Sequence, residues 1–182
     1  MKKKINQRGI GIILGYINFA VKMIIQLIYV PVMLRLLGDN EYGVYQLVTS
    51  VVSYLGILDF GFAGAYLKFY SETIGNERKE ERLNSTYMSL FSVMAFLATI
   101  CGIILARNAN FVLGNKLTSS ELMLAKKLLI VLSVNLGINF FNSVFTSFII
   151  SRENFLFQRI INLVATILNP IVTIALLLHG YG

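Results

Sequence analysis

Five long apolar stretches constrain this chain more than any other feature of its sequence. Each exceeds the roughly 20 helical residues that cross the hydrocarbon core of a bilayer. In lipid, only helices and closed barrels satisfy all their backbone hydrogen bonds, and long unbroken apolar runs favour helices. The sequence therefore predicts an all-α, polytopic membrane protein, with 1–182 as a single transmembrane domain. The five expected transmembrane helices cover about 10–37, 42–70, 84–106, 122–150 and 155–178.

The composition excludes other broad classes of protein. Of the 182 residues, 56% are hydrophobic and 14% are charged, whereas soluble domains average about 45–50% apolar and about 25% charged residues. Disorder is excluded as well, because disordered chains have low hydrophobicity. The net charge of +7 suggests nucleic acid in a soluble chain, but membrane proteins concentrate Lys and Arg in cytoplasmic loops. We therefore expect membrane lipids around the helices and no nucleic-acid partner.

Short polar segments predict the connections between the helices. Gly38 suits the left-handed C-cap of the first helix, and Asp39 or Asn40 can cap the second. This turn is tight, so the first two helices are expected to form an antiparallel hairpin. The later connections are expected over 72–84, 108–121 and 151–154.

The second connection carries a run of mixed charge. Residues 76–82 read Asn-Glu-Arg-Lys-Glu-Glu-Arg, and such a run cannot enter hydrocarbon. The run therefore indicates a solvated loop, and Asn84 or Ser85 is the expected N-cap of the third helix.

The distribution of positive charge predicts a cytoplasmic N-terminus and places Gly182 outside. With the N-terminus inside, the inner side holds ten basic residues: Lys2, Lys3, Lys4, Arg8, Lys68, Arg78, Lys79, Arg82, Arg152 and Arg159. The outer side holds five: Arg35, Arg107, Lys116, Lys126 and Lys127. Because Lys and Arg gather in cytoplasmic loops, this bias favours the orientation with the N-terminus inside.

Polar residues in three of the predicted helices gather on one face of each helix. Residues three or four positions apart share a face, because a helix advances about 100° per residue. The stripes are Gly11, Gly15, Asn18, Lys22 and Gln26; Asn135, Asn139, Asn142 and Thr146; and Gln158, Asn162, Thr166, Asn169 and Thr173. Two interpretations remain open: the stripes either pack helices together through amides and small residues or line a shared polar cavity.

Lys22 favours the cavity. It lies about 13 residues, or roughly 20 Å, into the first helix. A lysine near the centre of a bilayer costs about 2.5–3.5 kcal/mol, which is tolerable when its ammonium group faces water or an anion. The candidate substrate-binding residues on the stripes are Lys22, Asn18, Gln26, Asn135, Asn139, Asn142 and Asn162.

Asp59 is the only acid within a predicted span. Three interpretations remain open: an ion pair with Lys22, an ion pair with Lys68 or another cation near the inner side, and a proton or cation site. We include Asp59 and Lys68 among the candidate binding residues. Gly61 and Gly64 follow Asp59, and they permit either a kink or a close contact between helices.

The sequence contains no motif for catalysis. It lacks a His, Cys, Asp and Glu cluster at metal-ligand spacing, a phosphate-binding glycine loop and a nucleophile elbow. We therefore expect no enzyme activity, no metal site and no cofactor.

Three motifs carry a resemblance to a known family. They are Leu-Leu-Gly-Asp-Asn-Glu-Tyr-Gly-Val-Tyr at 36–45, Leu-Asp-Phe-Gly-Phe at 58–62 and Arg-Glu-Asn-Phe at 152–155. With them, the chain resembles the N-terminal part of the polysaccharide-biosynthesis flippases of the multidrug/oligosaccharidyl-lipid/polysaccharide exporter superfamily. The resemblance implies a MATE-like fold with two lobes around a central cavity. The five helices would form part of the N-terminal six-helix lobe.

The resemblance also implies a function. Such flippases move undecaprenyl-diphosphate-linked oligosaccharide repeat units across the cell membrane by alternating access, for O-antigen or capsule synthesis. Lys22 would then bind the diphosphate, and amides such as Asn135 and Asn162 would bind sugar hydroxyls. The alternatives are a cation-coupled multidrug exporter of the same superfamily, which would use an acid such as Asp59, and a non-transporting membrane partner subunit.

The length of the chain predicts a fragment. It ends after the fifth stretch, where a sixth helix would follow. We therefore expect a piece of a longer transporter, which is inactive alone. Its expected partners are the missing C-terminal half or other polysaccharide-assembly proteins.

Overall fold

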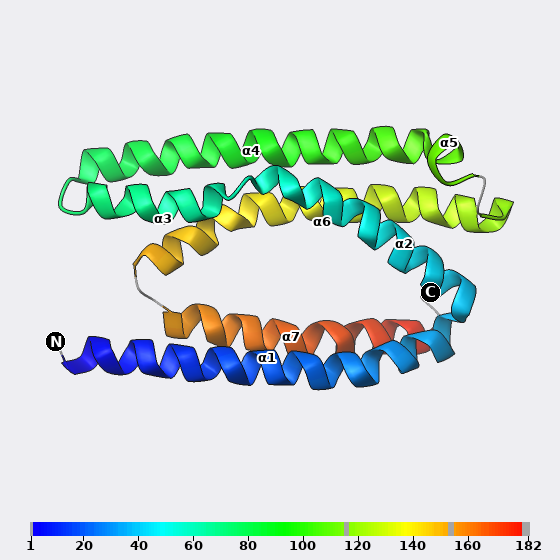
Figure 1. Cartoon of the computed structure of the whole chain (residues 1–182), viewed down its shortest axis with the longest axis horizontal. Helices are drawn as coiled ribbons and strands as arrows, with labels where there is room; N and C mark the ends of the chain where they lie inside the picture. The colour runs from blue at the N-terminus through cyan, green and yellow to red at the C-terminus, as the bar shows by residue number, and fades with distance from the viewer. Residues whose placement is uncertain (1, 115–116, 153–154, 180–182) are drawn as a thin grey trace. The chain divides into compact units, whose positions relative to one another are not determined.

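The computed structural model describes residues 2–114, 117–152 and 155–179. Within them the chain is all-helical and contains no strand (Figure 1). The elements are α1 (Lys2–Leu37), α2 (Asp39–Leu55), the 3-10 turn η1 (Gly56–Asp59), α3 (Phe62–Thr73), α4 (Glu77–Arg107), α5 (Ala109–Leu113), α6 (Ser119–Ser151) and α7 (Phe155–Leu178). The sequence predictions that concern Lys116, Glu153, Asn154 and Gly182 fall on residues outside these described ranges.

Five segments of the described chain are long and apolar enough to cross a membrane. They are Gly9–Leu37, Asp39–Thr73, Glu77–Arg107, Ser119–Ser151 and Leu156–Leu178. The prediction of an all-α protein with five transmembrane helices is therefore confirmed by the length and apolar character of the helices.

The chain divides into two compact units. Residues 1–42 and 152–182 form unit 1, which contains α1 and α7, and residues 43–151 form unit 2, which contains most of α2 together with α3 to α6.

In unit 1, α1 and α7 pack side by side and run in the same direction (Figure 1). Gly15 lies against Arg159, and further along both helices residues 25–29 face residues 167–174 across a groove. Residue numbers therefore increase in the same direction along α1 and α7, so the two helices are parallel. A chain that crosses a bilayer once per span places its first and fifth spans parallel, so this packing agrees with five crossings.

In unit 2, α4 and α6 share the largest interface and run antiparallel (Figure 1). Gly102 lies against Ser133, and Gly137 lies against Thr99 and the carbonyl group of Ala95. Small residues at these positions let the two backbones approach closely, which is how membrane helices associate when apolar burial gives no advantage over lipid.

Two apolar clusters complete unit 2, one towards each end of α6. The first joins α2 and α5 to the start of α6 and contains Val44, Val48, Val52, Ala106, Ala109, Leu113, Ala125 and Leu129. The second joins α3 to α4 and the later part of α6 and contains Tyr66, Tyr87, Phe91, Met94, Ala98, Phe140 and Val144. The second cluster holds α3 against α6, and that contact forms the pocket described below.

The predicted start of the third transmembrane helix is wrong. α4 begins at Glu77 rather than near Asn84, so the charged run at 77–82 is helical and Asn84 lies inside the helix. Asn76 is the N-cap, and its side chain accepts a hydrogen bond from the Lys79 N–H at 3.2 Å. Charge keeps this run out of hydrocarbon, but Glu, Lys and Arg are good helix formers, so the helix continues into water.

The third connection is also shorter than predicted. It contains the short helix α5, and α6 begins at Ser119. A capping box explains that start: the Glu121 carboxylate accepts from the Thr118 N–H at 2.8 Å, and Thr118 Oγ1 accepts from the Glu121 N–H at 3.5 Å.

The second predicted span is not one continuous helix, because η1 separates α2 from α3. Phe60 and Gly61 follow η1 with φ of +45° and +75°, in the left-handed region. The kink that the glycines permit is therefore present at Gly61. The predicted left-handed C-cap of α1 is confirmed as well, since Gly38 has φ +83°.

Candidate functional site

A polar pocket lies between α3 and α6 in unit 2. Its volume is about 370 Å³, which falls within the range of small-molecule sites. Its walls carry two amides and three hydroxyl groups, and no charged side chain. The lining residues are Gly64, Leu67, Asn139, Asn142, Ser143, Thr146, Ser147 and Ile150.

The amide stripe predicted on the fourth transmembrane helix supplies one wall of this pocket. The Asn139 amide donates to Asn135 Oδ1 at 2.9 Å, and the Ser143 hydroxyl donates to the Asn139 carbonyl group at 3.0 Å. Asn139 and Asn142 are both exposed, so the Asn142 amide and the remaining Asn139 groups can bind a polar ligand. Three residues of the predicted stripe, Asn139, Asn142 and Thr146, therefore line one pocket, and their role in substrate binding stays a prediction.

The opposite wall comes from α3. Gly64 and Leu67 line this wall, and nothing lies within 4 Å of the position of a Cβ on Gly64. Lys68 follows one turn later on the same face of α3, and its side chain is exposed. Lys68 is not among the residues that line the pocket, and its role in binding stays a prediction.

Asp59 lies at the end of η1, just before the kink. Its Oδ1 atom is buried and has no hydrogen-bond partner among the described residues. No ion pair to Lys68 is found in this part of the chain, so that interpretation is not supported. The pair with Lys22, a pair with another cation near the inner side, and the proton or cation site stay predictions.

In unit 1, the polar stripes of the first and fifth transmembrane helices meet along the seam between α1 and α7. The Thr166 hydroxyl lies 3.3 Å from Asn18 Oδ1 and donates to the Asn162 carbonyl group at 2.7 Å. This contact supports the packing interpretation for part of both stripes. The predicted cavity shared with the stripe of α6, in unit 2, stays a prediction.

Other polar residues of these stripes are not covered by protein. Lys22 shares a face of α1 with Asn18, but its side chain is exposed, as are those of Gln26 and Asn162. Neither α1 nor α7 contains an Asp or Glu. No acid on its own helix pair can therefore neutralise Lys22, which keeps it available to an anion.

Arg159 is a candidate that the sequence analysis missed, because its charge was assigned to the cytoplasmic side. It lies within the span Leu156–Leu178, and its guanidinium group packs against α1 at Gly15, where a Cβ would stand 3.5 Å from Arg159 Cζ. The available signal was its spacing: Arg159 precedes Thr166 by seven residues, or two turns, and so shares its face.

Comparison of the sequence with models of known protein families identifies the family of this chain. The model of the MatE family matches residues 16–175. The chain belongs to the MatE family. MatE proteins are membrane transporters of the exporter superfamily named above. A search of curated proteins and a search of solved structures each returned no match.

The matched range contains every candidate residue of both units. The α3–α6 pocket and the α1–α7 seam are therefore parts of the MatE region itself. This MatE protein presents two polar surfaces: a pocket of amides and hydroxyls in unit 2, and a basic seam without acids in unit 1.

Proposed function

We propose that this MatE protein translocates oligosaccharides linked to a lipid diphosphate, such as undecaprenyl-diphosphate repeat units, across the cell membrane. The α3–α6 pocket is the observation that carries the proposal. Sugars present many hydroxyl groups, and amide and hydroxyl side chains offer them both donors and acceptors. The pocket walls supply these groups without any charge, as a neutral sugar requires.

Cations near the two polar surfaces support the diphosphate part of the substrate. Lys68 lies one turn from the pocket glycine on α3, while Lys22 and Arg159 lie on a helix pair without acids. Hydrogen bonds from Lys and Arg to phosphate are roughly twice as strong as neutral ones. We assign the sugar to Asn139 and Asn142 of the α3–α6 pocket, and we keep Lys22 and Arg159 of unit 1 as separate candidates for binding phosphate groups.

The test measures how lipid-linked repeat units are distributed between the two leaflets of the host membrane, with and without this protein. We expect cells that lack the complete transporter to accumulate the repeat units on the cytoplasmic leaflet, and the complete transporter that contains this chain to restore their export. Asn142→Leu should restore at least tenfold less export at equal expression, because leucine cannot bind sugar hydroxyls. Asn110→Leu is the matched control, since Asn110 is an exposed asparagine of α5.

A second function is favoured by one observation. The buried Oδ1 of Asp59 without a partner suits a group that binds a proton or cation, as a cation-coupled multidrug exporter requires. Under that alternative, cells lacking the protein become sensitive to cationic drugs, and Asp59→Asn abolishes efflux. Normal drug resistance together with accumulated lipid-linked sugar would instead support the flippase.

A further inference from the structure

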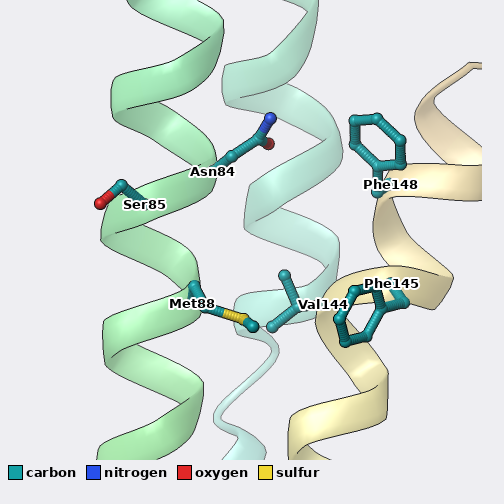
Figure 2. A pocket seen from close by; sticks show the side chains of 6 residues that line it. All are labelled: Asn84, Ser85, Met88, Val144, Phe145 and Phe148. Carbon is teal, nitrogen blue, oxygen red and sulfur yellow. The ribbon is translucent and has the colours of Figure 1, made fainter.

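A second pocket of unit 2 lies between α4 and α6 (Figure 2) and has a different chemistry. Its volume is about 380 Å³. The residues that line it are Asn84, Ser85, Met88, Val144, Phe145 and Phe148. No residue of this set lines the α3–α6 pocket, so the two pockets are separate sites on unit 2.

The pocket has one polar end and an apolar remainder. Figure 2 shows Asn84 and Phe148 at one end, and Met88, Val144 and Phe145 one turn further along their helices. Apart from Asn84 and the exposed Ser85, the walls are thioether, aliphatic and aromatic. Such walls suit a hydrocarbon chain with one hydrogen-bonding group near its end.

The polar end offers a donor. The Tyr66 hydroxyl donates to Asn84 Oδ1 at 2.5 Å, which fixes the orientation of the amide and leaves Nδ2 as its donor. None of the described residues accepts a hydrogen bond from Nδ2. A ligand group at this end should therefore be an acceptor.

The position of the pocket along α4 sets its depth in the bilayer. The charged run at 77–82 cannot enter hydrocarbon, and Asn84 follows it directly, while Met88 lies one turn deeper. The pocket thus begins where the helix leaves the polar interface and extends into the apolar layer. At this level the ester groups of a phospholipid meet its acyl chains.

We propose that this pocket binds one acyl chain of a membrane glycerophospholipid, whose ester carbonyl accepts a hydrogen bond from Asn84 Nδ2. A polyprenyl phosphate is the other long-chain lipid to consider, and its phosphate oxygens also accept hydrogen bonds, but no Lys or Arg of the described residues lines this pocket to balance the charge of a phosphate group. The site lies outside the sugar pocket, and the proposal does not depend on the substrate proposed above.

The test uses native mass spectrometry of the detergent-purified protein with a diacyl phosphatidylglycerol as probe. Met88→Trp fills the pocket, and we expect it to weaken binding at least tenfold. Val93→Trp is the matched control, because Val93 is an exposed residue of α4 outside the pocket. We expect it to bind within twofold of the parent. Equal binding by the two tryptophan variants would overturn the site.

A second measurement tests the hydrogen bond and does not depend on how Met88→Trp folds. The dialkyl ether analogue of the probe lacks the ester carbonyl, and we expect the parent to bind it about fivefold more weakly, as the loss of one hydrogen bond implies. Asn84→Leu should bind ester and ether probes equally. Tyr66→Phe removes the hydrogen bond that orients the Asn84 amide but keeps the amide itself, so it should reduce the preference for the ester without abolishing it.

Two outcomes would contradict the proposal. If undecaprenyl phosphate displaces the diacyl probe from the parent but not from Met88→Trp, the pocket belongs to the polyprenyl chain. If the parent binds ester and ether probes equally, Asn84 does not recognise the carbonyl group.

Discussion

Gly102 on α4 lies so close to Ser133 on α6 that a methyl group on the glycine would overlap the serine side chain. Ser133 is fully buried, and its hydroxyl oxygen has no hydrogen-bond partner among the described residues. The pair therefore sets the separation of α4 and α6 by shape alone. Because α6 carries the pocket amides, this contact also positions Asn139 and Asn142.

The first prediction concerns this contact. Gly102→Ala should lower the free energy of unfolding by about 1–3 kcal/mol, the usual cost of overpacking, and thermal unfolding in detergent would measure it. Gly43→Ala is the control, because nothing lies within 4 Å of a Cβ at Gly43. There alanine should be neutral or stabilise the helix by about 0.5–1 kcal/mol.

The same contact predicts compensation. Ser133→Gly removes the side chain that Gly102→Ala would overlap, so the double variant should recover most of the lost stability. Additive losses in a double-mutant cycle would show that the two residues do not limit the approach of α4 and α6.

A second prediction concerns Lys22. In the complete transporter that contains this chain, we expect Lys22→Met to reduce transport at least tenfold at normal expression, because the cation for the diphosphate is lost. Lys22→Arg should keep part of the activity, since charge survives with a different geometry. Arg107→Met, which removes an exposed cation at the end of α4, is the control. If Lys22→Met is as active as the parent, Lys22 serves only in packing.

The third prediction uses the contact between Gly15 and Arg159. Gly15→Ala should be tolerated, because its Cβ would meet the guanidinium group at ordinary contact distance, 3.5 Å. Gly15→Leu should displace the guanidinium group and lower transport as much as Arg159→Met does. Gly9→Leu adds the same side chain to α1 where nothing lies within 4 Å of the Cβ, and it should remain active. Full activity of Arg159→Met would exclude Arg159 from the site.

The fourth prediction is the orientation in the membrane. In a Cys101→Ala background, single cysteines at Asn40, Glu77 and Asn110 report three connections, and all three residues are exposed. Glu77 is chosen because it leaves the Asn76 cap intact. An impermeant thiol reagent added to intact cells should label positions 40 and 110 but not 77. Labelling at 77 alone would reverse the orientation.

Local features of the sequence were enough to predict the transmembrane helices. The length of an apolar run decides whether a helix can cross a bilayer, and all five runs are helical spans. The left-handed Gly38 is equally local, because only its own backbone conformation matters. The predicted start of α4 was wrong for a related reason. A run of charge shows where a helix leaves the hydrocarbon layer, but the helix itself can continue into water.

The sites depended on contacts between distant parts of the chain. Helical periodicity placed Asn139 and Asn142 on one face, but the pocket exists because α3 lies opposite them with Gly64 and Leu67. The charge of Arg159 was assigned to the cytoplasmic side from the sequence, and only the structure showed that its guanidinium group packs against Gly15 of α1. The sequence by itself determined which segments are helical spans and which faces are polar, because both follow from short-range periodicity. Only the tertiary structure decided which helix faces pack together. Such packing depends on small residues that lie opposite each other on helices far apart in the chain.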